Sequence, residues 1–276
     1  MRRSSPIGLN LLFYTAFTLS LFSSCYEPIE GCLNPLSTNF QLDADNACDD
    51  CCNFPSIGIQ FFPLWDTFNL DTVNFFLTNE LGQNLRINQS QFFISNVFLT
   101  GTPEGILSTR DSVILNCEPP QTLFNTLDII SLTNQTAEIE DVILDEGYNT
   151  VHVDIGISEC LASIDTVGFT NQIPTLENLS SVQMAENEFL SHEFVIEFED
   201  DLGTERIIRF VNSEALVSLD FTNVLDDFFE LRGTGISIDI DVRYDLWFSD
   251  LLSSDTDEQI KQKILQNSIG SFTLRE

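Results

Sequence analysis

Strict alternation of apolar and polar residues is the feature that most limits what this chain can fold into. It is clearest in residues 236–244, where every second residue is Ile, Val or Tyr and those between are Ser, Asp or Arg. Side chains of a strand point alternately to its two faces, so this pattern predicts one buried face and one charged face. A similar alternation predicts strands at 151–157 and 194–198. Further candidate strands are residues 57–62, 85–99, 112–117, 128–132, 206–211 and 216–221.

Half-buried strands in this number predict an all-β fold, an antiparallel two-sheet β-sandwich. The 24 Phe residues, within a hydrophobic share of 43%, are enough to fill its core. One short C-terminal helix is also expected. Ser254 or Asp255 would cap it, residues 257–258 would make its first turn acidic, and Ile260 and Ile264 would share its buried face.

The first 25 residues read as an export signal. Arg2 and Arg3 precede an apolar stretch at 7–22, and Ser23 and Ser24 lead into Cys25. The spacing resembles the bacterial lipobox, which implies that residues 1–24 are removed and Cys25 is acylated. A plain secretory signal and a buried amino-terminal helix are the alternatives.

Each buried acyl methylene contributes about 0.8 kcal/mol, so acyl chains on Cys25 would hold the protein on a membrane. No later stretch is apolar and long enough to span one. We therefore expect an outer-membrane lipoprotein of the bacterial cell envelope, on its periplasmic or cell-surface face.

The chain is strongly acidic, with 43 Asp and Glu against 11 Lys and Arg and a formal net charge of −32. Binding to a phosphate backbone needs clustered basic residues, so nucleic acid is excluded as a partner. Solubility of an exported protein explains the acidity better than a dedicated cation-binding role.

Cysteine usage favours disulfides. If Cys25 carries lipid, an even number of cysteines remains, namely Cys32, Cys48, Cys51, Cys52, Cys117 and Cys160. Six cysteines in an exported chain permit fifteen pairings, which the sequence does not resolve. A thiolate metal site formed by Cys48, Cys51 and Cys52 is the weaker alternative in an oxidising envelope.

Residues 25–54 form a separate segment, with the lipidated cysteine and a tether followed by a cysteine-rich acidic module. The module resembles one found in surface and secreted proteins of the Bacteroidetes, matching at Gly31, Cys32, Pro35, Asn39, Phe40 and Cys48. The resemblance implies a disulfide between Cys32 and Cys48.

The acidic residues of this module are candidate calcium ligands. Asp43, Asp45, Asp49 and Asp50 supply the hard oxygen donors that calcium prefers. The EF-hand spacing is missing, however, with neither its Gly nor its Glu in place, so a solvated acidic turn is the alternative.

Four stretches of the remaining domain, residues 55–276, carry a family resemblance. They are residues 85–99, residues 147–157, residues 238–242, and residues 246–248 followed by the helix and 267–272. Together they resemble the MbnP-like domain, a periplasmic or surface β-sandwich family related to copper-binding proteins of methane-oxidising bacteria. The resemblance implies the same sandwich for residues 55–276.

The resemblance also implies copper binding through His side chains, in some members joined by an oxidised Trp. This chain mostly lacks them: Val113 and Asn212 stand where His is expected, and Met184 alone remains of a Met-aromatic-Trp motif. Strand alternation places His152 opposite the core face and His192 at its edge. His192 with Met184 is therefore the best remaining copper pair.

Motifs for catalysis are absent from the sequence. It holds no Gly-x-Ser-x-Gly elbow, no phosphate-cradling glycine loop and no His-Glu-x-x-His helix. Paired carboxylates would suit a glycosidase, but among 43 acids any chosen pair has little meaning. Trp65 and Trp247 would suit stacking on a sugar, although aromatic residues of a sandwich are more often buried. We interpret the chain as a non-enzyme.

These observations predict a lipid-anchored binding or scaffold module whose copper ligands are largely missing, with a protein, glycan or metal as its ligand. One rival is a copper acquisition or storage protein using His152, His192, Met184 and free thiols. Another is a calcium-dependent adhesion module that uses the acidic residues.

Overall fold

The structure is a computed structural model of the chain. It describes residues 27–35, 37–70, 75–101, 112–115, 117–124, 128–139, 148–163, 188–222 and 236–275. The described residues form two compact units, each considered by itself. Residues 27–35 and 40–52 form the first, here called the cysteine module, and residues 37–39 and 53–275 belong to the second, here called the sandwich domain. The predicted signal at 1–24 and Cys25 lie outside the described residues.

The cysteine module contains a short parallel pair of strands and a 3-10 turn. They are β1 (Glu30–Gly31), β2 (Asn46–Ala47) and η1 (Asp49–Cys51).

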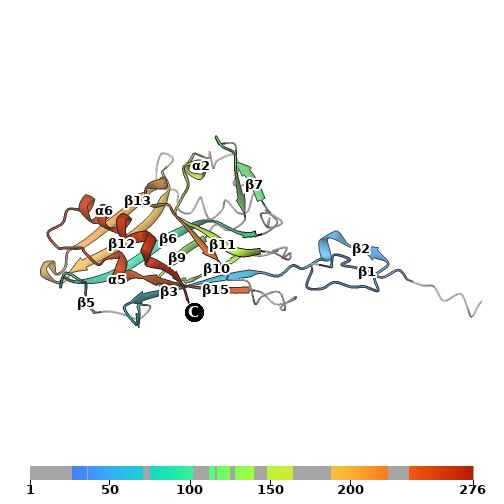
Figure 1. The fold of residues 1–276 in the computed structure, drawn as a ribbon, viewed down its shortest axis with the longest axis horizontal. Coiled ribbons are helices and arrows are strands. Elements are labelled where there is room, and N and C mark those ends of the chain that lie inside the picture. The colour runs from blue at the N-terminus through green and yellow to red at the C-terminus, as the bar shows by residue number, and fades with distance from the viewer. Residues whose placement is uncertain are drawn as a thin grey trace, which may run out of the picture. The chain divides into compact units, whose positions relative to one another are not determined.

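The sandwich domain consists mainly of two β-sheets (Figure 1). The smaller contains β3 (Ile57–Trp65), β4 (Phe68–Asn69), β10 (Thr136–Ile139), β15 (Ile236–Arg243) and β16 (Phe272–Leu274). The larger contains β5 (Leu77–Thr78), β6 (Asn84–Gly101), β9 (Asp128–Ser131), β11 (Tyr148–Ile155), β12 (Leu190–Phe198), β13 (Glu205–Val211) and β14 (Val217–Thr222). A separate hairpin pairs β7 (Ser112–Leu115) with β8 (Gln121–Phe124).

The predicted all-β sandwich is confirmed, since one hydrophobic core draws buried residues from both sheets. The prediction of wholly antiparallel strands is wrong in one place, because β3 and β15 run parallel, with Ile57 opposite Ile236. A parallel pair needs a long crossover connection. Here the chain between β3 and β15 supplies the whole larger sheet.

The long strand β6 changes phase along its length. Its core residues are Leu85 and Ile87, then Phe92 and Ile94, then Val97. The register against β12 and β11 shifts between these groups, as a β-bulge produces when one extra residue enters a strand. Simple alternation over residues 85–99 therefore does not assign the faces of this strand.

A smaller hydrophobic cluster lies apart from the main core. Phe93 of β6 is buried there with Leu115 of β7 and Leu161 of helix α2 (Glu159–Ala162). Figure 1 shows β7 and α2 together at the top of the view. The disulfide between Cys117 and Cys160 links these two segments.

The C-terminal helix α6 (Asp257–Ser268) buries Ile260 and Ile264, as predicted. Its cap is a different residue from the expected ones. The Thr256 side chain accepts from the backbone N–H of Gln259, in a capping box. Asp255 instead accepts from the ammonium group of Lys263 at 2.6 Å.

The other helical segments are short, and sequence reasoning did not anticipate them. They are α5 (Tyr244–Trp247), η3 (Glu199–Asp201), η4 (Asn212–Ala215) and η6 (Ile269–Ser271). No helix in the described part of the chain is long and apolar enough to cross a membrane.

Candidate functional site

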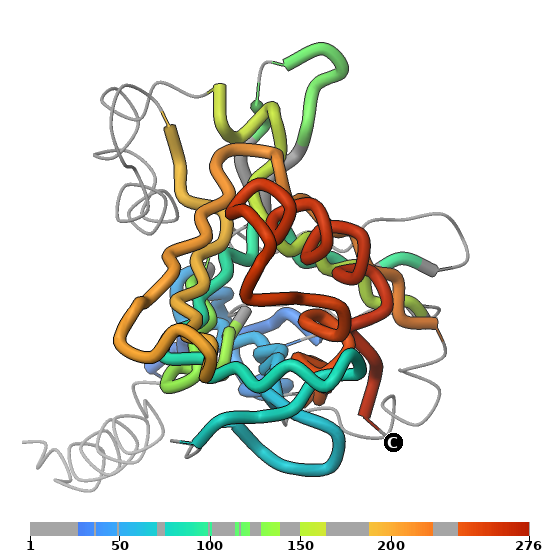
Figure 2. Tube along the Cα trace, turned by 90° about the vertical axis from the view of Figure 1, so that its left-hand side faces the viewer, coloured from blue at the N-terminus to red at the C-terminus, as the bar shows by residue number. Residues whose placement is uncertain are grey.

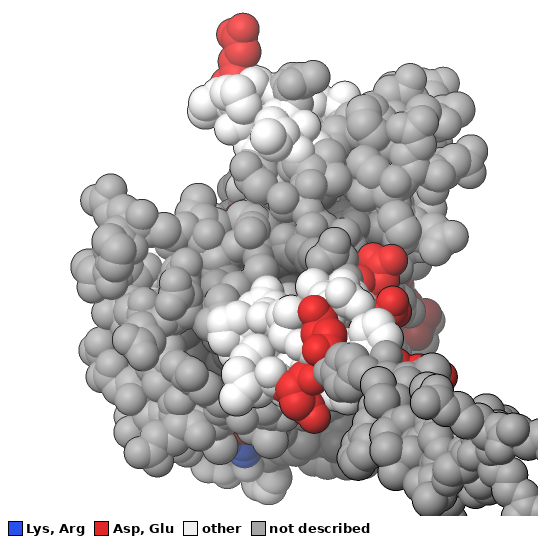
Figure 3. All heavy atoms as spheres, turned by 90° about the vertical axis from the view of Figure 1, so that its right-hand side faces the viewer, with Lys and Arg blue, Asp and Glu red and all other residues white. Residues whose placement is uncertain are grey.

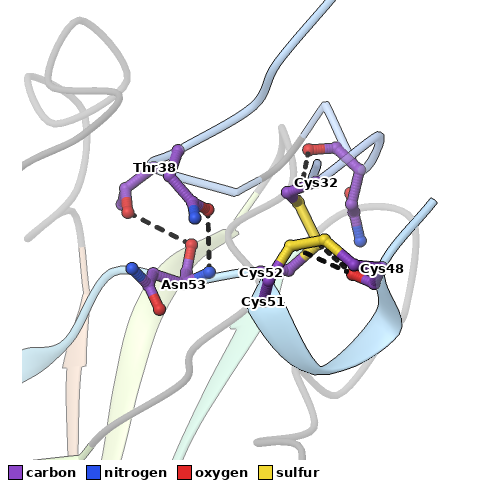
Figure 4. Close-up of a disulfide and its surroundings, with 8 residues drawn as sticks. Cys32, Thr38, Cys48, Cys51, Cys52 and Asn53 are labelled. Carbon is purple, nitrogen blue, oxygen red and sulfur yellow. Dashed lines mark hydrogen bonds between the residues drawn. A yellow bond between two sulfur atoms is a disulfide. The ribbon is translucent and has the colours of Figure 1, made fainter. Parts of the chain in front are cut away.

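The cysteine module holds two disulfides, Cys32–Cys52 and Cys48–Cys51 (Figure 4). With Cys117–Cys160, all six predicted cysteines are paired. The implied Cys32–Cys48 pairing is wrong, because the turn η1 folds Cys51 back onto Cys48 and leaves Cys52 opposite Cys32. The alternative of a thiolate metal site is also wrong, since its three sulfurs are bonded in disulfides.

The predicted calcium ligands of the module lie mostly at its surface. Asp43, Asp45 and Asp50 are exposed, and Asp45 accepts from the backbone N–H of Ile29 at 2.9 Å. The side chain of Asp49 lies outside the described residues. Within the described part of the chain, no three His, Cys, Asp or Glu residues gather as a metal site. Calcium binding stays a prediction, which a melting curve with and without chelator would check.

His152 is held between two carboxylates on the face of the larger sheet opposite the core. Its Nδ1 lies 2.7 Å from Asp220 Oδ1 and its Nε2 lies 3.0 Å from Asp154 Oδ1. Burial of the ring opposes its charge, but these hydrogen bonds and the two negative charges raise the pKa of His152. Because each ring nitrogen already has a carboxylate partner, the arrangement is that of an ion-paired imidazolium.

His192 lies deeper than the predicted edge of the core, with only 1% of its surface exposed. The rings of Phe92, Phe194, Phe210 and Trp247 surround it at centroid distances of 5.9–6.3 Å. Helix α5 contributes Trp247 to this cover, so a residue distant in sequence completes the burial.

Burial lowers the pKa of His192 to about 3, so its imidazole is neutral. Nδ1 lies 3.0 Å from the Ser191 hydroxyl, while Nε2 has no hydrogen-bond partner among the described residues. The predicted second ligand, Met184, lies outside the described residues. Asn212, at an expected His position, instead accepts from the backbone N–H of Phe189 at 3.0 Å.

The described part of the sandwich domain holds a groove of about 530 Å³, here called the aromatic groove. It lies where the β3–β4 turn meets β5 and α5, and Figures 1 and 2 show that turn near β5 at the lower edge of the domain. It is lined by Trp65, Asp66, Phe68, Phe75, Phe76, Leu77, Thr78, Asn79, Glu80 and Asp245.

Local structure explains why the groove stays open. Trp65 pairs with Phe68 across the tight β3–β4 turn, and Asp66 adopts the left-handed conformation there, with φ of 54°. The buried amide of Asn79 donates to the carbonyls of Phe248, at 3.2 Å, and Leu251, at 2.7 Å. These contacts fix the turn and the wall of the groove against the rest of the domain.

Exposed aromatic side chains distinguish the groove. Phe68 is 60% exposed and Phe75 is 55% exposed, while Trp65 is buried beside them. Sequence reasoning singled out Trp65 but missed both phenylalanines. Their signal was the density of aromatic residues at positions 65, 68, 75 and 76, beyond the predicted strand at 57–62.

The charges around the groove are mainly negative. Arg243 donates to both carboxylate oxygens of Asp245, at 2.8 and 2.5 Å. Burial alone would raise the pKa of Asp245, but the hydrogen bonds and charge of Arg243 lower it. Asp66 and Glu80 form no ion pair with any residue in the described ranges.

Comparison with known proteins adds little to this picture. No family profile matches the sequence, and no curated protein matches it. Among solved structures, the chain is similar to MbnP from Methylosinus trichosporium, with 7% identity and a TM-score of 0.42. The match covers 73% of this chain and 79% of that one. A likeness at this level carries no argument about function, which must come from the residues themselves.

Proposed function

We propose that the chain is a lipid-anchored binding module of the cell envelope that holds its partner in the aromatic groove. The observation that carries the proposal is that two largely exposed rings, Phe68 and Phe75, line a concavity of about 530 Å³. Leaving a Phe exposed forgoes about 1.5–3 kcal/mol of burial. Exposed apolar surface gathered in a concave site is typical of ligand binding.

A second concavity of the sandwich domain lacks this character. It surrounds the Cys117–Cys160 disulfide and measures about 510 Å³. Its lining includes two prolines and two glutamates but no aromatic side chain. The aromatic groove is therefore the better candidate of the two.

Binding without catalysis fits the chemistry of the groove. The titratable groups that line it are the carboxylates of Asp66, Glu80 and Asp245. His152 is held by its two carboxylates, and His192 is enclosed in the core. Neither imidazole is free to serve the groove as a general base, which supports the proposal of a non-enzyme.

The proposed location is the outer membrane, on its periplasmic or cell-surface face, with acylated Cys25 as the anchor in the manner of Bacteroidetes lipoproteins. Its support is the signal-like start and the net charge of −32, which disfavours nucleic acid as a partner. Among the described charged side chains in Figure 3, the acidic ones (red) cover more of this face than the basic ones (blue). Replacing Cys25 with Ser should move the protein from the membrane fraction to the soluble fraction, and a variant that stays on the membrane would refute the anchor.

The groove is tested by screening peptide and glycan arrays with the purified full chain. Binding should be lost in the double variant Phe68→Ala, Phe75→Ala. The matched control is Leu202→Ala, which removes a side chain that is 67% exposed outside the groove. Array binding that survives in the groove variant would overturn the proposal.

Copper binding is a second candidate function, favoured by one observation. His192 presents a neutral imidazole whose Nε2 is buried and has no partner among the described residues. Neutral imidazole is a copper ligand. Copper retained by the full chain after desalting should then be lost in His192→Ala and kept in His152→Ala. Absence of retained copper in the unaltered chain would remove this candidate.

A further inference from the structure

We infer that the aromatic groove receives a guanidinium or ammonium group, carried by an Arg or Lys side chain of a partner protein. The inference rests on the proposed function, because it names the chemistry of the ligand that the groove binds.

The aromatic rings of the groove favour a cation. Phe68 and Phe75 line the groove and are each more than half exposed, with Trp65 buried beside them. The face of an aromatic ring is electron-rich and attracts a cation placed over it. Several such rings around one concavity form a site that favours a positive charge over a neutral group of the same size.

The charges that line the groove are negative. Asp66, Glu80 and Asp245 line the groove, and no Lys or Arg does. Arg243 pairs with Asp245 and also interacts through its charge with Asp66, although neither Asp66 nor Glu80 forms an ion pair in the described part of the chain. A neutral or anionic ligand would cover these carboxylates without compensation, whereas a cation pairs with them.

The protein's own cations lie over phenyl rings in the same way. Arg86 lies over the ring of Phe76, with its charge centre 5.2 Å from the ring centroid, and also pairs with Glu197. Three more cations combine a phenyl ring with a carboxylate: Arg206 on Phe198 and Asp257, Lys261 on Phe210 and Glu214, and Arg275 on Phe62 and Asp241.

The aromatic groove has the same components. One of its rings, Phe76, already carries Arg86, whereas no cation of the described residues lies over Phe68 or Phe75. The groove offers phenyl rings and unpaired carboxylates, and the four internal examples show which group completes such a set. A single guanidinium would fill only part of about 530 Å³, so the residues flanking it in a polypeptide would occupy the remainder. The net charge of −32 would also draw a basic segment towards the surface.

The test measures binding of a fluorescent peptide, acetyl-Ala-Arg-Ala-Arg-Ala-amide, to the purified full chain at physiological salt. Its control is the same peptide with citrulline in place of arginine, which keeps the shape and removes the charge. We expect the citrulline peptide to bind about tenfold more weakly, the size of effect that a cation on aromatic rings provides.

The matched protein variants are Asp66→Asn with Glu80→Gln, and Glu138→Gln with Glu188→Gln. Both pairs remove two negative charges. Asn tolerates the left-handed conformation of position 66, so the turn is kept. Glu138 lies opposite Gly58, near the other end of β3 from the groove, and Glu188 precedes β12. We expect about tenfold weaker binding of the arginine peptide for the groove pair and almost no change for the control pair.

Equal losses in both pairs would mean general attraction to an acidic surface and would overturn the inference. Equal binding of the two peptides, or array hits confined to neutral glycans that depend on Phe68 and Phe75, would also overturn it while leaving the proposed function standing. If the binding of no ligand depends on Phe68 and Phe75, both the inference and the proposed function would be overturned.

Discussion

His152 Nδ1 lies 2.7 Å from Asp220 Oδ1, across the pairing of β11 with β14. The same ring contacts Asp154, whose carboxylate also accepts from the hydroxyl of Ser218 at 2.5 Å. Burial would raise the pKa of Asp154, but these hydrogen bonds and the charge of His152 lower it. The two strands are thus linked by side chains as well as by their backbone ladder, and the link depends on pH.

We expect His152→Gln to lose more stability at pH 6 than at pH 9. A histidine with a raised pKa contributes stability that is complete below its unfolded pKa of about 6.5 and is lost as the pH rises through the folded value. Because Asp220 is largely exposed, the difference should be only about 1 kcal/mol. Urea unfolding at both pH values measures it, and parallel stability curves for the two proteins would contradict the expectation.

The contribution of His192 to stability should depend on pH in the opposite direction. Its folded pKa of about 3 is below the unfolded value, so its contribution is present above about pH 6.5 and is lost as the pH falls. At pH 5 the free energy of unfolding of the unaltered chain should be about 2 kcal/mol lower because of this residue. His192→Leu cannot titrate and should keep that stability. Urea unfolding at pH 8 and pH 5 with chelator present tests this, and an equal loss in both proteins would refute it.

The fold was largely predictable because one face of most strands is buried. Alternation over residues 236–244 correctly located β15, and Phe194 correctly marked a core-facing strand. Two features of the fold were not predicted from the sequence, for physical reasons. The bulges of β6 change which residues face the core without changing the composition, and the parallel pairing of β3 with β15 depends on a partner far along the chain.

The candidate site was less predictable, because contacts between distant segments create it. Trp65 was noticed as an aromatic residue, but the groove is lined by segments distant in sequence, which bring Phe68, Phe75 and Asp245 to one site. The same limit applies to His192, whose burial depends on Trp247. Local patterns report which way a side chain points and say little about what covers it.

Ser90 and Tyr244 form a buried hydrogen bond between β6 and α5, with their oxygen atoms 2.6 Å apart. Removing either hydroxyl leaves the other one buried without its hydrogen-bond partner, which costs about 1–3 kcal/mol of stability. We expect Ser90→Ala and Tyr244→Phe each to destabilise the chain. The double variant should lose less than the sum of the two, and urea unfolding of all four proteins measures the coupling. Strictly additive losses would show that the hydrogen bond contributes nothing.

Thr256 caps helix α6, although Ser254 and Asp255 fit the sequence pattern for that role. Its hydroxyl accepts from Gln259 N–H at 3.3 Å, while the Gln259 side chain accepts from Thr256 N–H at 2.9 Å. Loss of such a cap costs about 1 kcal/mol. Thr256→Ala should therefore lower the free energy of unfolding by that amount. Ser254→Ala, at an exposed position two residues earlier, should change it little. A larger loss for Ser254→Ala would place the start of the helix where the sequence pattern suggested.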